Sequence, residues 1–196
     1  MRYLPNAITV LRILITPLVL VLVVSDTAAS LFWAWLAFIV ASISDYLDGK
    51  LARRLDVPTR FGQFLDPLAD KILVVGTFAA IAFRHPDVVP WWAVGLIAVR
   101  DLYVTLLRAY AERSGRSLRT SGVAKAKTVV QLTFLIAVLL ILSLSRLAGP
   151  AVGDVARSIL ESAAPVVALV AVVAITVGTG LLYGFRTEYS AVRGRR

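Results

Sequence analysis

The sequence contains no cysteine and a single histidine, His85. The absence of cysteine excludes disulfides and thiolate metal sites, and one histidine cannot form a zinc site by itself. Acidic residues are also scarce, because the 196 residues include only 12 aspartates and glutamates against 21 lysines and arginines. Any metal ion would therefore be bound through oxygen atoms, which hard divalent cations prefer.

Apolar residues, in contrast, make up 59% of the chain, and its mean hydropathy is +0.81. A helix that crosses the hydrocarbon core of a bilayer needs about 20 mostly apolar residues. The sequence therefore predicts an all-α polytopic membrane protein, organised as a single domain over residues 1–196, with six transmembrane helices. The predicted helices span residues 7–25, 30–49, 61–83, 90–112, 124–146 and 162–185. Residues 1–6 are expected to form a short amphipathic helix along the membrane interface.

The basic residues predict which way the helices cross the membrane, because cytosolic loops carry an excess of lysine and arginine. With the N-terminus in the cytosol, only Arg84, Arg146 and Arg157 fall on the outer side, and the other 18 of the 21 basic residues fall inside. The C-terminus is then cytosolic as well. His85 is expected to be a solvated residue of an outer loop. The predicted outer ends of two helices also carry the aromatic residues typical of a membrane interface, Trp33, Trp35, Trp91 and Trp92.

The net charge of +9 would suit either a nucleic acid or an anionic membrane surface. A nucleic-acid-binding domain would place its charges on a polar scaffold, whereas the scaffold here faces lipid. We therefore expect anionic membrane lipids as partners, and no nucleic acid.

Four aspartates stand at the predicted inner ends of the second and third helices. Asp45 and Asp48 are three residues apart, and Asp66 and Asp70 are four apart, so each pair lies on one helix face. A carboxylate near the bilayer core costs roughly 2.5–3.5 kcal/mol or more, and such residues usually line a site or a pathway. Four carboxylates in one pocket would repel one another in a low dielectric. They can stay ionised together if one or two divalent cations lie among them, which predicts a metal site.

The residues beside the aspartates suit a phosphate ligand. Gly49, Ala52 and Gly62 leave room for a ligand to approach the backbone, and Arg53 adds a fixed positive charge. One alternative is purely structural, with helix-end carboxylates paired to nearby lysines and arginines. A second alternative is a divalent-cation transporter, although the aspartates cluster at one interface only.

The complete pattern, Asp45-x-x-Asp48-Gly49-x-x-Ala52-Arg53, eight residues, then Gly62-x-x-x-Asp66-x-x-x-Asp70, resembles the signature of the CDP-alcohol phosphatidyltransferase family. Members of that family transfer a phosphatidyl or similar group from a CDP-linked lipid to an alcohol and release CMP. The resemblance implies CDP-diacylglycerol as a substrate, a homodimer, and Mg²⁺ or Mn²⁺ as the cofactor, with two ions. The implied metal ligands are Asp45, Asp48, Asp66 and Asp70, and Asp70 is either a ligand of the second ion or the general base. The implied CDP-lipid site is lined by Gly49, Ala52, Arg53 and Gly62.

Asn6 and Thr9 in the first helix are further candidates for the nucleotide pocket, because they share a stripe with Arg12. Packing or a contact with lipid headgroups explains that stripe equally well. Near the other end of the chain, Gly180-x-x-x-Gly184 is predicted to allow close helix packing, within one chain or between two.

Weaker motifs resemble the bacterial branch of the family that uses glycerol 3-phosphate as its acceptor. They comprise residues 4–12, Arg100-Asp101, Leu107-Arg108 and residues 125–131, where Ala124 replaces the glycine expected before Lys125. This likeness implies a bacterial inner (plasma) membrane protein with its active site facing the cytosol. Arg100 and Asp101 are expected to form an internal ion pair.

The small phosphorylated alcohol that acts as acceptor needs cations near the metal site. The candidates lie at the inner ends of the fourth and fifth predicted helices and are Arg108, Arg119, Lys125 and Lys127. Their alternative role is that of ordinary cytosolic charges in contact with anionic lipid. Inositol phosphate, serine and phosphatidylglycerol remain as other acceptors within the same family.

Overall fold

The computed structural model describes the backbone of residues 4–55, 60–113, 116–118, 122–185 and 189–191, and the side chains of residues 12–44, 71–107, 109–110 and 127–181. Within these residues the chain forms six long helices, one short helix and a single pair of short strands. The long helices are α1 (Leu4–Ser25), α2 (Ala28–Leu55), α3 (Arg60–Arg84), α4 (Trp91–Arg113), α5 (Gly122–Leu147) and α7 (Ala164–Phe185). The short helix is α6 (Pro150–Glu161), and the antiparallel strands are β1 (Arg116–Leu118) and β2 (Tyr189–Ala191). The all-α prediction is therefore confirmed, apart from these two three-residue strands.

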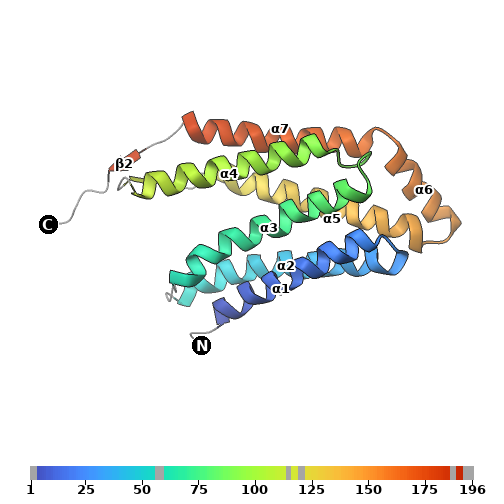
Figure 1. Ribbon diagram of the computed structural model, residues 1–196, viewed down its shortest axis with the longest axis horizontal. Helices are drawn as coiled ribbons and strands as arrows, with labels where there is room; N and C mark the ends of the chain where they lie inside the picture. Colours follow the sequence, from blue (N-terminus) through green and yellow to red (C-terminus); the bar gives the residue numbers. More distant parts are fainter. Residues whose placement is uncertain (1–3, 56–59, 114–115, 119–121, 186–188, 192–196) are drawn as a thin grey trace.

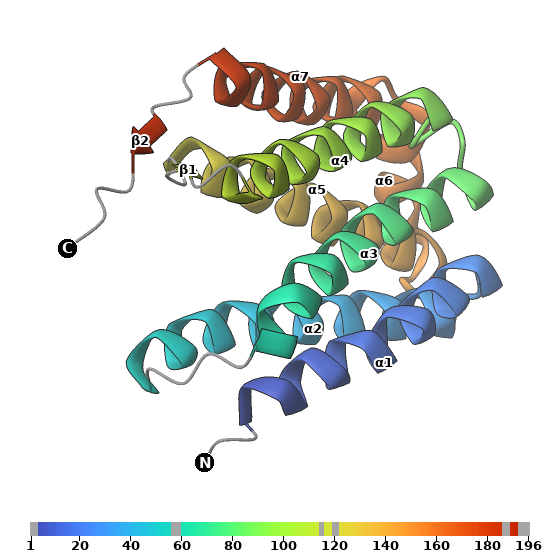
Figure 2. The ribbon, with the colours of Figure 1, turned by 60° about the vertical axis from the view of Figure 1, so that its left-hand side comes forward.

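The six long helices run along the long axis of the molecule (Figure 1). The last turns of α2 and the first turns of α3 lie at the end of the bundle where α1 begins, and both views show them there (Figures 1 and 2). We call this the aspartate end, because α2 and α3 carry the four aspartates. The short helix α6 lies at the opposite end, which we call the α6 end.

Apolar packing joins the helices into one bundle. Helix α1 packs against both α2 and α3, α5 packs against α2 and α7, and α4 packs against α7. Phe38 and Phe78 are among the largest side chains that are fully buried, and the ring of Phe78 stacks on that of Phe134 with centroids 5.8 Å apart. The core thus holds α1 beside the two helices that carry the aspartates.

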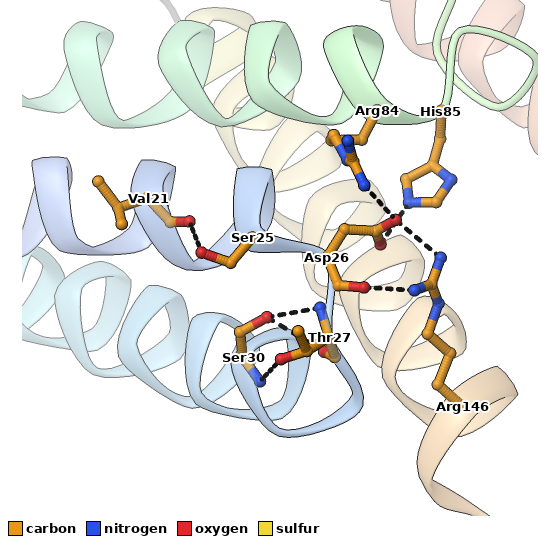
Figure 3. Close-up of polar contacts among 8 residues, drawn as sticks. All are labelled: Val21, Ser25, Asp26, Thr27, Ser30, Arg84, His85 and Arg146. Carbon is orange, nitrogen blue, oxygen red and sulfur yellow. Dashed lines mark hydrogen bonds and ion pairs between the residues drawn. The ribbon is translucent and has the colours of Figure 1, made fainter.

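The turn from α1 to α2 is encoded locally. Asp26 has a positive φ of 53°, a left-handed conformation that aspartate tolerates better than most residues. Thr27 and Ser30 then cap α2 reciprocally: the Ser30 amide donates to Thr27 Oγ1 at 3.1 Å, and the Thr27 amide donates to Ser30 Oγ at 2.9 Å (Figure 3). This pair follows the logic of a capping box, in which two otherwise unbonded amides find side-chain acceptors.

Within the part of the chain whose side chains are described, two helical stretches are long and apolar enough to cross a membrane, judged by length and composition. They are residues 127–147 of α5 and 164–181 of α7, with mean hydropathies of 2.4 and 2.3. The sides of the bundle are apolar as well. One residue on each of five helices illustrates this, with 61–66% of its surface exposed: Leu14, Phe83, Val99, Val129 and Val167. Exposed apolar surface on this scale is typical of a protein that faces lipid or a partner.

The structure departs from the predicted boundaries at three places. Helix α2 continues to Leu55, six residues past the predicted end at residue 49, because residues 50–55 include good helix formers and a helix can outlast its membrane-spanning part. Residues 4–6 belong to α1, so the separate interfacial helix predicted for residues 1–6 is wrong for this part. Helix α6 occupies a region predicted as a loop. Its Pro150 stands at the first turn, where proline favours a helix.

Candidate active site

The two aspartate pairs lie on helical backbone at the same end of the bundle. Asp45 and Asp48 are in the second half of α2, and Asp66 and Asp70 are in the first half of α3. The helical conformation keeps the members of each pair on one face of their helix. Figures 1 and 2 show the last turns of α2 and the first turns of α3 at the same end of the bundle. The four carboxylate groups themselves lie outside the described side chains.

The residues predicted to bind the CDP-lipid lie on α1, α2 and α3. Gly49, Ala52 and Arg53 follow the aspartates along α2, and Gly62 lies in the first turn of α3. The stripe that contains Asn6 and Thr9 lies in α1. The side chains of these residues are outside the described set. Because α1 packs against both α2 and α3, the fold brings all three segments to one region of the bundle.

Arg12 is the member of this stripe whose side chain the structure describes. It is only 2% exposed, so α1 carries a guanidinium group into the interior of the bundle rather than to its lipid-facing side. Thr16, one turn later, donates its hydroxyl to the Arg12 carbonyl at 2.7 Å. Burying a charged group is unfavourable unless neighbouring groups pair or hydrogen-bond with it.

A buried ionic network stands next to the aspartate helices, on α4, α5 and α7. Asp101 is 5% exposed, and its Oδ1 lies 2.9 Å from Arg100 Nη1 and 2.5 Å from Lys127 Nζ. Arg100 also donates from Nε to the Thr176 carbonyl at 2.9 Å and from Nη2 to Thr179 Oγ1 at 3.1 Å. The predicted ion pair of Arg100 and Asp101 is therefore confirmed, and Lys127 is a second cation at the same carboxylate.

Glycine makes this network possible on α7. A methyl group at Gly180 would lie 2.8 Å from Cγ and 2.9 Å from Nε of Arg100, closer than real contacts allow. The close packing predicted for Gly180 is thus a contact within one chain, between α7 and the Arg100 side chain of α4. Gly184 lies outside the residues whose side chains are described.

A second chain of hydrogen bonds links the network to α3. Lys71 directly follows Asp70 in sequence, and its Nζ donates to Thr105 Oγ1 of α4. Thr105 Oγ1 in turn donates to the Asp101 carbonyl at 2.6 Å. Two lysines, one from α3 and one from α5, are thereby held along the same stretch of α4.

The predicted acceptor cations are only partly described. Lys127 is placed, by its ion pair with Asp101. Arg108 lies in α4 and Lys125 in α5, but their side chains are outside the described set, and Arg119 is outside the described residues altogether. Sequence reasoning missed that Lys127 joins the pair of Arg100 and Asp101, because Asp101 and Lys127 are 26 positions apart.

A separate polar cluster ties the helices together at the α6 end (Figure 3). The Asp26 carboxylate lies 3.2 Å from Arg84 Nη2, 2.8 Å from Arg146 Nη2 and 3.0 Å from His85 Nε2. The prediction that His85 is a solvated loop residue is wrong, since its side chain is 17% exposed and faces this carboxylate. Burial by itself would raise the pKa of Asp26. The hydrogen bond and charge of His85, together with the charge of Arg146 and the hydrogen bond of Arg84, outweigh that effect and hold the pKa below its ordinary value.

Among the side chains that the structure describes, no three histidines or carboxylates gather into a group that could hold a metal ion. The Asp26 cluster is a single carboxylate surrounded by basic groups, which repel cations. The four aspartates predicted to bind metal, on α2 and α3, lie outside the side chains in that search.

The sequence profile of CDP-alcohol phosphatidyltransferases matches residues 2–177, which include both aspartate helices and the network around Asp101. The chain belongs to the CDP-alcohol phosphatidyltransferase family. Two relatives are CDP-diacylglycerol–glycerol-3-phosphate 3-phosphatidyltransferases. The one from Bacillus subtilis (strain 168) is 37% identical over 150 residues, covering 70% of this chain and 76% of the relative. The one from Escherichia coli (strain K12) is 34% identical over 137 residues, covering 67% of this chain and 73% of the relative.

Family membership makes this chain a transferase of phospholipid biosynthesis. The helical backbone of α2 and α3 presents the signature residues at one end of the bundle.

Proposed function

We propose that this enzyme transfers the phosphatidyl group of CDP-diacylglycerol to glycerol 3-phosphate, giving phosphatidylglycerophosphate and CMP. The observation that carries the proposal is the placement of the complete aspartate signature on adjoining parts of α2 and α3. The names of the two relatives favour glycerol 3-phosphate among the acceptors that the sequence leaves open.

The four aspartates fit a pair of hard divalent cations, because they offer only carboxylate oxygens, which Mg²⁺ and Mn²⁺ prefer. Asp45, Asp48 and Asp66 would hold the ions, with Asp70 as a further ligand or as the general base. When bound, such ions neutralise the pyrophosphate and stabilise the CMP leaving group.

The protein's own groups position the substrates and move one proton. Arg53 pairs with a phosphate of the CDP-lipid, and the small residues of α2 and α3 let the nucleotide approach the backbone. Asp70 accepts the proton of the acceptor hydroxyl. That oxygen then forms a bond to the lipid-side phosphorus as the bond from this phosphorus to the CMP oxygen breaks. Asn6 and Thr9 of α1 close the nucleotide side.

The acceptor's phosphate group is bound by cations from α4 and α5. A dianion such as glycerol 3-phosphate is recognised best by several charge-assisted hydrogen bonds, and the groups that supply them are Arg108, Arg119, Lys125 and Lys127. The contact of Asp101 with Lys127, at 2.5 Å, supports this arrangement because it holds the part of α5 that carries the lysines against α4. Asp101 is a positioning residue in this proposal.

The proposed setting is a bacterial inner (plasma) membrane, crossed by α1–α5 and α7. The N- and C-termini and the aspartate end face the cytosol, and the protein acts as a homodimer in contact with anionic lipids. The apolar sides of five helices and the hydropathy of α5 and α7 support the membrane setting. The excess of basic residues at the aspartate end supports its orientation.

The test is CMP release by purified protein in mixed micelles containing CDP-diacylglycerol, with Mg²⁺ or Mn²⁺ and a panel of acceptors. Activity with glycerol 3-phosphate that exceeds activity with inositol phosphate or serine is expected. Asp66→Asn should abolish turnover, while the matched variant Asp87→Asn, at an exposed position of the turn before α4, should retain it. Normal turnover by Asp66→Asn would show that the metal assignment is wrong, and CMP release with inositol phosphate alone would replace the acceptor.

A further inference from the structure

Helix α6 differs from the other helices in both direction and length. It crosses the end of the bundle between α5 and α7, whereas those helices run along the long axis (Figures 1 and 2). Its 12 residues correspond to about 18 Å, too short to span a bilayer. The helix therefore has one side against the bundle and the remaining sides available to its surroundings.

The side that faces the bundle consists of two small residues and one leucine. Gly153 and Ala156 are buried, and Leu160 packs partly against the core. A methyl group at Gly153 would lie 3.2 Å from the Ala148 carbonyl, so the helix sits very close to the end of α5. Arg157 strengthens the attachment by donating from Nη1 to the Ser145 carbonyl at 3.1 Å. The orientation of α6 about its own axis is thus set by α5.

A second side of α6 carries a row of large apolar residues that the bundle does not cover. Val152, Val155 and Ile159 are 52%, 59% and 38% exposed. At about 100° per residue they fall within a sector of roughly 60°, which makes them one continuous stripe. Because α5 fixes the rotation of the helix, the stripe cannot turn inward to be buried in the same chain.

The third side is polar. Asp154, Arg157, Ser158 and Glu161 are all exposed, and Arg157 pairs with Asp154 along the surface. On the helical wheel Glu161 lies about 160° from Ile159, so the polar side and the apolar stripe face in nearly opposite directions. A helix with these two faces, lying across the end of a membrane bundle, has the geometry of a helix in the plane of the membrane interface.

The same end of the bundle carries exposed tryptophans. Trp33, Trp91 and Trp92 are 55%, 54% and 49% exposed and stand near the start of α2 and α4. Tryptophan is enriched where the acyl chains meet the headgroups, because its ring is apolar and its N–H is polar. The stripe of α6 therefore lies at the level of the molecule where the bilayer surface is expected.

We propose that α6 is an interfacial helix that inserts the stripe of Val152, Val155 and Ile159 into the boundary between headgroups and acyl chains of the outer leaflet. Its polar side then faces the water outside the cell membrane. The inference rests on the six-span topology of the proposed function. It commits to lipid as the occupant of the stripe because the stripe lies at the end of the bundle that carries the exposed tryptophans.

The absence of native cysteine permits a direct test by single labels. Ile159→Cys, Glu161→Cys and Val99→Cys are each labelled with the fluorophore NBD and reconstituted in phosphatidylethanolamine–phosphatidylglycerol vesicles. The vesicles carry lipids with a nitroxide quencher either near the headgroup or near the middle of the acyl chain. Val152→Cys serves as a second stripe position if Ile159→Cys does not fold. Val99, 66% exposed on α4, reports the middle of the bilayer.

The label at Ile159 should have blue-shifted emission and be quenched by the shallow nitroxide at least about twofold more than the label at Glu161. The label at Val99 should be quenched most by the deep nitroxide. Equal, water-like signals at Ile159 and Glu161, with deep quenching at Val99, would overturn the interfacial helix and leave the topology intact. No quenching at Val99 would overturn the topology itself. Blue-shifted emission at Ile159 without quenching, together with cross-linked dimers of Ile159→Cys, would show that a second copy covers the stripe and would also overturn the proposal.

Discussion

Replacing Asp101 by asparagine should destabilise the bundle, because two cations would lose the carboxylate that compensates them. Asp101 is 5% exposed, and the side chains of Arg100 and Lys127 are 9% and 12% exposed. Removing one partner of a buried ion pair costs about 3–5 kcal/mol. The lower figure applies here, since Arg100 keeps its hydrogen bonds to Thr176 and Thr179.

The assay is thermal unfolding of the purified protein in detergent micelles. A loss of about 3 kcal/mol corresponds to a fall in Tm of about 6–12 °C for a chain of this length. Asp154→Asn is the matched control. Asp154 also pairs with an arginine, but its side chain is 67% exposed, so this pair is worth only about 0–1 kcal/mol.

A second substitution separates the ion pair from a general loss of packing. Lys127→Met removes the cation nearest to Asp101, so the double variant with Asp101→Asn should be less destabilised than the sum of the two single variants. The expected coupling is about 1–2 kcal/mol, within the range for residues in contact. A fall in Tm of less than about 2 °C for Asp101→Asn, or additivity within about 0.5 kcal/mol, would refute the account of this network.

Three further predictions follow from single contacts. Gly180→Ala should lower Tm and Gly95→Ala should not, because a methyl group at position 180 would meet Arg100 at 2.8 Å while nothing lies within 4 Å of one at position 95; equal Tm values would contradict this. Folding lowers the pKa of the Asp26 carboxyl, so the ionised carboxylate stabilises the folded protein at neutral pH, and this contribution is lost as the pH falls below about 3.9. In acid unfolding measurements, the free energy of unfolding of Asp26→Asn should lack this pH-dependent contribution. Lys125→Ala should raise the KM for glycerol 3-phosphate by roughly 10- to 100-fold, as expected for one charge-assisted contact, and leave the KM for CDP-diacylglycerol unchanged; an unchanged acceptor KM would return Lys125 to a role in lipid contact.

Hydropathy predicted the six long helices because each contains an apolar stretch that stands out in the sequence. Within the described residues, only the stretches in α5 and α7 are long and apolar enough to cross a membrane. Hydropathy did not predict helix α6. Its apolar residues form a stripe rather than a run, so average hydropathy stays low over its 12 residues. The amphipathic spacing of Val152, Val155 and Ile159 was the signal that could have revealed it.

The Asp26 cluster was out of reach of sequence reasoning. Its arginine and histidine partners are 58, 59 and 120 positions away along the chain. Arg84 ends α3, His85 follows it directly, and Arg146 lies in the last turn of α5. No local sequence pattern indicates that these helix ends meet. Their meeting depends on how α1, α3 and α5 pack.

The sequence by itself determined the helical character of the chain, its family and the spacing of the four aspartates. These features are local, since a helix places residues three or four apart on one face whatever surrounds it. Only the tertiary structure decided that Asp101 joins Arg100 and Lys127, that Gly180 gives Arg100 its space, and that His85 lies against Asp26. Each of these contacts joins distant segments, and the burial of apolar surface between whole helices determines which distant segments meet.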